Sequence, residues 1–168
     1  MMDRPLASAN DDSDIRNAFA AARKLLDDPE HMEDAITELT ALADRGCSEA
    51  MVCLGTVYLE GEDLQRKDEA AALFKKAADL GDSGGMRNLG YMHAVGIHTE
   101  KDKQKAIEWY TRSANAGNPR AQCNLGVIYN HGKYVPADHM EAVKWFSLSA
   151  MNGYSRGQTN RNNAPKSG

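Results

Sequence analysis

The sequence is poor in cysteine and has no long apolar run, and each absence excludes a class of protein. Its three cysteines, Cys47, Cys53 and Cys123, show none of the paired spacings of zinc or redox sites. Reduced thiols without a metal are therefore expected, with Cys53 and Cys123 as small, semi-buried helix residues. The longest apolar stretches, such as residues 18–22, fall far short of the roughly 20 residues that a membrane-spanning helix needs. The sequence thus predicts no contact with a membrane.

Neither sign of charge dominates the chain. Twenty Lys and Arg stand against 24 Asp and Glu, a net charge of −4, and the basic residues are scattered. Because nucleic-acid binding usually needs a clustered basic surface, we expect no nucleic-acid partner. Residues 1–13 are polar and acidic and contain no apolar core of a signal peptide. We expect a flexible tail there and, unless an export signal has been removed, a cytoplasmic location.

Catalytic and cofactor motifs are also missing. The five histidines form no His-Glu-x-x-His pattern, and the glycines have the wrong spacing for a phosphate-binding loop. Enzymes need a nucleophile with a base, a paired acid and base, or a metal constellation, and none of these can be recognised. We therefore expect no enzyme activity, no metal and no cofactor.

What the sequence does contain is an internal repeat of about 36 residues. Glycines at Gly46, Gly81, Gly117 and Gly153 are separated by 35, 36 and 36 residues. Further marks recur in the same order within each repeat. These are the Leu-Gly pairs 54–55, 89–90 and 125–126, the alanines 70, 106 and 142, and the bulky pairs 73–74, 109–110 and 145–146. The Leu-Gly pair lies early in each repeat, and the alanine and the bulky pair lie later. Each repeat is therefore predicted to contain two structural segments.

The apolar spacing predicts a helix in each segment. Ala50, Leu54 and Tyr58 lie four residues apart and so share one helix face. Helices are expected at residues 14–26, 34–44, 48–59, 67–80, 84–95, 103–116, 119–130 and 138–151. A glycine can end a helix in the left-handed conformation without a Cβ penalty. Because one helical hairpin cannot bury its apolar face alone, the hairpins should stack into an all-α solenoid.

Two segments carry a resemblance to a known family. Residues 72–96 read ALFKKAADLGDSGGMRNLGYMHAVG, and residues 106–132 read AIEWYTRSANAGNPRAQCNLGVIYNHG. They resemble the Sel-1-like repeat family, which is similar in shape to tetratricopeptide repeats. The resemblance implies a right-handed α-α superhelix, with a leading helix and linker at 14–33, the repeat array at 34–153, and an incomplete repeat with a polar tail at 154–168. It also implies a role as an adaptor that binds other proteins.

Some cysteine-rich relatives in this family have been linked to penicillin binding or β-lactamase activity. The chain contains neither a Ser-x-x-Lys nor a Lys-Thr-Gly motif. It also lacks the regular pairs of cysteines that stitch together the hairpins of those relatives. The resemblance therefore does not imply this activity here.

The repeat pattern fails after Gly153. Gly157 replaces the expected alanine, and Arg161 and Asn162 replace the Leu-Gly pair. We expect the stack to end there without a complete next helix. The rings of Trp145 and Phe146 would then need covering by a self-contact, a removed segment or a partner.

In the related tetratricopeptide architecture, the first helix of each hairpin lines the concave surface. The candidate partner-binding residues on these helices are Glu49, Val52, Arg87, Asn88, Tyr91, Arg120, Asn124, Val127, Asn130 and His131. Asn88 and Asn124 hold the same position in successive repeats, where an amide could bond a peptide backbone or, equally, its own hairpin. The main hypothesis is a groove for an unidentified partner protein or peptide. The alternative is an architectural or self-associating module whose concave face is unused.

Overall fold

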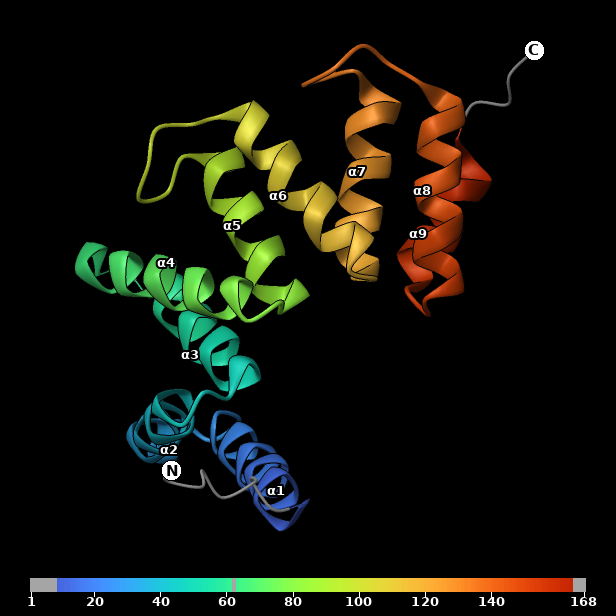
Figure 1. The fold of residues 1–168 in the computed structure, drawn as a ribbon. Helices are drawn as coiled ribbons and strands as arrows, with labels where there is room; N and C mark the ends of the chain where they lie inside the picture. The colour runs from blue at the N-terminus through green and yellow to red at the C-terminus, as the bar shows by residue number, and fades with distance from the viewer. Residues whose placement is uncertain (1–8, 62, 165–168) are drawn as a thin grey trace, which may run out of the picture.

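A computed structural model describes residues 9–61 and 63–164, and this part of the chain is helical throughout (Figure 1). Each helix packs against the next along the chain, which confirms the predicted all-α stack of hairpins. None of the described helices is long and apolar enough to cross a bilayer. The helices are α1 (Ala9–Leu25), a short 3-10 helix (Pro29–His31), α2 (Met32–Asp44), α3 (Ser48–Glu60), α4 (Leu64–Asp79), α5 (Ser83–Val95), α6 (Lys103–Asn115), α7 (Pro119–His131), α8 (His139–Met151) and α9 (Ser155–Asn163).

The turns between repeats explain the glycine period. Gly81 and Gly117 have φ angles of 89° and 88°, in the left-handed region that favours glycine. The residue that follows each of these glycines is the N-cap of the first helix of the next repeat: Asp82 for α5 and Asn118 for α7. The Asp82 side chain accepts hydrogen bonds from the Gly84 and Gly85 amides, and the Asn118 side chain does the same for Arg120 and Ala121.

The glycines of the Leu-Gly pairs lie inside the helices, and the structure shows why they must be small. A Cβ atom added at Gly90 of α5 would lie 2.7 Å from the ring of Tyr110 on α6. Gly55 stands in the same relation to Phe74, at 2.7 Å, and Gly126 to the ring of Phe146. Each glycine therefore makes room for the aromatic ring of the second helix in its own hairpin.

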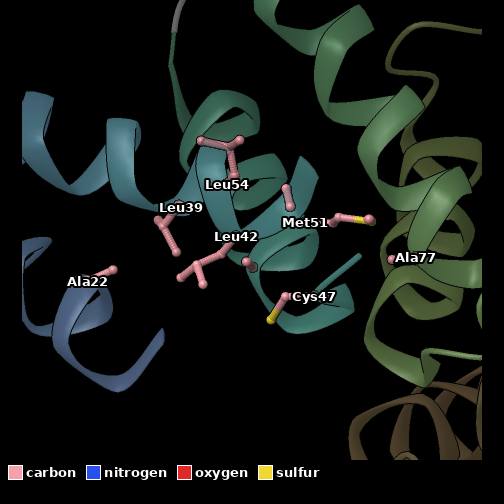
Figure 2. Packing of buried hydrophobic residues seen from close by; sticks show 9 residues of the cluster. Ala22, Leu39, Leu42, Cys47, Met51, Leu54 and Ala77 are labelled. Atoms are coloured by element: carbon pink, nitrogen blue, oxygen red, sulfur yellow. The ribbon is translucent and has the colours of Figure 1, made fainter. Parts of the chain in front are cut away.

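The N-terminal part of the core joins α1 and α2 to the repeats. Figure 2 shows Leu39 and Leu42 of α2 packed towards Met51 and Leu54 of α3, with Ala22 of α1 on their other side. Leu39 is completely buried. α1 begins at Ala9, five residues before the predicted start of the leading helix, so residues 9–13 are helical rather than a flexible tail. Residues 1–8 of the predicted tail lie outside the described residues.

The prediction for the C-terminal end was wrong. Residues 155–163 form α9, which packs on α8. Gly157 makes this contact possible, because a Cβ there would lie 2.7 Å from the Cβ of Ser149. Trp145 is 8% exposed and Phe146 is 2% exposed, so both rings are buried within the chain itself. They need no second copy, removed segment or partner to cover them.

Candidate functional site

The first helices of successive hairpins share one face, and this face contains an open groove of about 820 Å³. Five of the ten predicted binding residues lie in its wall: Glu49, Val52, Arg87, Asn88 and Arg120. The other lining residues are Phe19, Arg23, Leu26, Met32, Cys53, Thr56, Val57, Glu60, Gly61 and Asp82. The groove is therefore built by α1, α3, α5 and α7, with Met32 at the start of α2.

Apolar side chains line the α1 and α3 part of this groove, together with the charged residues Arg23 and Glu60. Phe19 of α1 and Leu26, just after α1, line the groove with Val52 and Val57 of α3, and all four are only partly buried. Partly buried apolar side chains around an open groove can give up water when another surface covers them. This part can therefore contribute non-polar contacts to a bound segment.

The α5 and α7 part of the groove carries two neighbouring arginines. Burial lowers the pKa of the Arg87 guanidinium, and the nearby positive charge of Arg120 lowers it further. Arg87 nevertheless stays charged at neutral pH, because the ordinary pKa of an arginine lies far above 7. Among the ion pairs of the described residues, neither arginine has a carboxylate partner. Arg87 donates instead to the Asn88 side-chain oxygen at 2.6 Å, and Arg120 lies 6.0 Å from the Tyr154 ring centre.

Two of the acidic residues of the groove are engaged by neighbours. The Asp82 carboxylate caps α5 and accepts a hydrogen bond from the Ser48 hydroxyl at 2.9 Å. Glu49 accepts from the same hydroxyl at 3.3 Å and from the Cys47 thiol at 3.6 Å. These carboxylates stabilise the starts of α3 and α5, and neither they nor Glu60, the third carboxylate in the lining, form an ion pair with the arginines within the described residues.

The two predicted asparagines differ in their surroundings. Asn88 is 4% exposed, and its side-chain oxygen accepts a hydrogen bond from Arg87 of the same helix. Asn124 is half-buried and lines a second hollow of about 220 Å³ on the same face. No hydrogen bond of its side chain occurs within the described residues. The other residues lining this hollow are Ala94, Tyr110, Cys123, Val127, Ile128, Tyr134, Tyr154 and Arg156.

The remaining predicted residues are not gathered into the groove. Val127 lines the second hollow, and with His131 it also lines a third one. The His131 ring nitrogen Nδ1 lies 2.9 Å from the Val127 carbonyl oxygen, and Asn130 Oδ1 lies 3.2 Å from the His139 ring. Tyr91 is 43% exposed and borders none of these hollows.

Sequence reasoning missed the contributions of α1 and α9. Phe19, Arg23 and Leu26 form the N-terminal wall of the groove, although the leading helix was expected only to cap the stack. Arg156 of α9 lines the second hollow. A signal for Arg156 was present, because it follows Arg120 by one repeat length of 36 residues.

The chemistry of the face suits binding better than catalysis. Burial raises the pKa of the Cys53 thiol, and the positive charge of Arg23 opposes this effect only in part. A thiol with a raised pKa is a poor nucleophile at neutral pH. Burial likewise raises the pKa of Tyr110 to about 12, so its hydroxyl stays neutral. No group of three or more potential metal ligands occurs in the described part of the chain.

Comparisons with known proteins agree with this architecture. A family model described as the Sel1 repeat matches residues 48–82, 83–118 and 119–154. These segments contain the hairpins α3–α4, α5–α6 and α7–α8. A sequence comparison with curated proteins finds no significant match.

Several solved structures are similar to the chain. A protective antigen of uropathogenic Escherichia coli with an SLR fold has 28% identity and a TM-score of 0.78, over 93% of this chain and 34% of the antigen. A Sel1 repeat protein from Oxalobacter formigenes has 26% identity and a TM-score of 0.77, over 94% of this chain and 66% of that protein. Cysteine rich protein B of Helicobacter pylori shares the fold at 19% identity and a TM-score of 0.54, over 91% of this chain and 97% of that one.

The chain thus spans about a third of the E. coli antigen and about two thirds of the O. formigenes protein. Its three repeat matches follow one another without a gap and coincide with three structural hairpins. Together they cover well over half of the sequence, and the chain therefore belongs to the Sel1 repeat family.

Proposed function

We propose that this chain is an adaptor that holds a segment of a partner protein in the groove of its concave face. The observation that carries the proposal is the pair Arg87 and Arg120, two arginines without a carboxylate ion-pair partner among the described residues, in an open groove that apolar side chains of its α1 and α3 part also line. Helical-repeat arrays of this kind use their extended concave surfaces for binding. Membership of the Sel1 repeat family supports a role in protein interaction.

The groove dimensions support a segment rather than a flat protein surface. Its volume of about 820 Å³ falls within the usual range for a binding pocket, and its walls come from four successive first helices. A bound segment would contact apolar side chains of α1 and α3 and arginines of α5 and α7. In such an arrangement the apolar contacts contribute affinity, and the charged groups fix the orientation of the bound segment.

The rival proposal, an architectural or self-associating module, has less support. Its self-associating form, through the C-terminal face, loses one reason, because Trp145 and Phe146 are buried within the chain. We also propose that the chain is not an enzyme, because burial raises the pKa of the Cys53 thiol on the concave face and so makes it a poor nucleophile at neutral pH.

The test is a capture experiment with native lysate and the Arg87→Glu/Arg120→Glu variant as bait beside the wild type. We expect about tenfold less of a specific partner on the variant, because reversed charges remove charge-assisted hydrogen bonds and add repulsion. The control is Lys75→Glu/Arg112→Glu, which makes the same charge change at exposed positions of α4 and α6. Circular dichroism should show equal helicity for all three proteins. Equal capture by the wild type and the groove variant would rule out this groove.

A further inference from the structure

The start of α9 repeats the start of α7. Residues 119–124 read PRAQCN and residues 155–160 read SRGQTN, so that an arginine, a glutamine and an asparagine recur at intervals of 36 residues. α9 packs on α8 through Gly157, one repeat after the buried Ala121 of α7. Arg156 therefore occupies on the last described helix the position that Arg120 occupies one hairpin earlier.

The arginines of the concave face consequently form a row. Arg87 and Arg120 lie in the α5 and α7 part of the groove, and Arg120 faces the ring of Tyr154. Tyr154 also lines the second hollow, where Arg156 and Asn124 lie. The row Arg87, Arg120, Arg156 thus runs from the groove into the second hollow, across Tyr154.

No carboxylate forms an ion pair with this row within the described residues. None of the three arginines belongs to an ion pair, and the lining of the second hollow contains no carboxylate. The groove itself is also lined by Glu49, Glu60 and Asp82, of which Glu49 and Asp82 are hydrogen-bonded at the starts of α3 and α5. None of these three carboxylates lines the second hollow. Neighbouring positive charges repel one another, so an anionic occupant is favoured over a neutral or basic one.

We propose that the row Arg87, Arg120, Arg156 binds an extended, acidic peptide segment of a partner protein. Carboxylates of the segment pair with the guanidinium groups, which match carboxylate geometry with two parallel hydrogen bonds. The amide of Asn124, unpartnered in the described chain, donates to and accepts from the peptide backbone beside Arg156. The proposal rests on the proposed function and adds the chemistry of the partner.

The tyrosines beside the row favour a peptide. Tyr110, Tyr134 and Tyr154 line the same hollow as Arg156. Aromatic side chains with a polar tip contribute both apolar area and hydrogen bonds to a peptide chain. A nucleic-acid backbone is disfavoured, because the basic residues of the chain are otherwise scattered and give no extended basic surface for a long polyanion.

The test is selection of random peptides of about twelve residues on the full chain, followed by fluorescence-anisotropy titration of the enriched peptides. We expect enrichment of Asp and Glu. Replacing these residues by Asn and Gln should weaken binding about tenfold, and binding should also weaken as salt rises. Arg156→Glu should weaken binding about tenfold, whereas Arg161→Glu makes the same charge change on the same helix, outside both hollows, and should leave binding within about twofold.

Weaker binding by Arg156→Glu could come from the lost contact or from a disturbed α9. A peptide with the opposite charge distinguishes these two causes. A peptide with Lys in place of one acidic residue should bind Arg156→Glu better than it binds the wild type, and a misfolded α9 could not produce that gain. Enriched peptides without acidic residues that still depend on Arg87 and Arg120 would overturn this inference and leave the proposed function standing. If no enriched peptide responds to any concave-face variant, both proposals fail. If Arg156→Glu and Arg161→Glu lose the same amount of peptide affinity, the loss is explained by the net charge of the chain alone. That result would overturn the inference.

Discussion

At the scale of single residues, the repeat is determined by which side chains must be small. Gly55, Gly90 and Gly126 each lie against the aromatic ring of the next helix, where a methyl group would clash. Phe74 and Phe146 are almost completely buried, so the rings have no free space into which they could move. The Leu-Gly pair is therefore a packing requirement of each hairpin.

Gly90→Ala should lower the free energy of unfolding by about 1–3 kcal/mol, the usual cost of overpacking a core. Urea denaturation followed by circular dichroism measures this change. In a Tyr110→Leu background the same substitution should cost less, because the ring that it meets is gone. Alanine is also the better helix former by about 1 kcal/mol, which favours the substitution once the clash is removed. An equal cost in both backgrounds would contradict the packing explanation.

The sequence revealed the positions of these glycines but not the reason for them. Gly90 and Tyr110 are twenty residues apart, and apolar spacing within one helix says nothing about which ring of another helix lies opposite. The candidate binding residues show the same limit. Periodicity placed Arg87 and Asn88 on the concave side, but only the structure shows that Asn88 is bonded to its neighbour.

At the scale of helices, the residue that caps one hairpin also ties it to the hairpin before. Asp82 caps α5 and accepts from Ser48 at the start of α3. Asn118 caps α7 and donates to the Ser83 hydroxyl at the start of α5, at 3.3 Å. The starts of the first helices are thereby linked along the concave face.

Asn118→Ala should destabilise the chain by about 1–2 kcal/mol, because it removes both a helix cap and a link between hairpins. The matched control is Asp138→Ala, which removes the cap of α8 through its bond to the Glu141 amide without such a link. Its cost should lie near 1 kcal/mol. Thermal or urea unfolding of both variants compares the costs. A smaller loss for Asn118→Ala than for Asp138→Ala would argue against the link.

Most helix boundaries could be predicted from the sequence to within three residues, because caps and turn glycines mark them. α9 was missed because its outward positions hold Arg161 and Asn162, where the repeat pattern calls for Leu and Gly. A terminal helix needs only one apolar or small face, and Gly157 with Ala164 provides it. The apolar pattern that identifies a helix packed on both sides therefore fails at the end of a stack.

At the scale of the whole molecule, the concave face depends on every first helix, including α1 and α9. α1 supplies Phe19 and Arg23 to the groove, with Leu26 just after it, and α9 supplies Arg156 to the second hollow. The sequence predicted the array and its concave side. It could not predict the extent of the binding face, because the helices at the two ends depart from the repeat pattern.

The most direct test of the central claim is a photo-crosslinker placed at Val52, inside the groove, in cells of the source organism. The matched position is Glu108, exposed on α6 in the second row of helices. Val52 should give a discrete crosslinked product that disappears in the Arg87→Glu/Arg120→Glu background, and Glu108 should give none. A product from Glu108 with none from Val52, or a Val52 product unchanged by the charge reversals, would contradict the claim that this groove holds a partner.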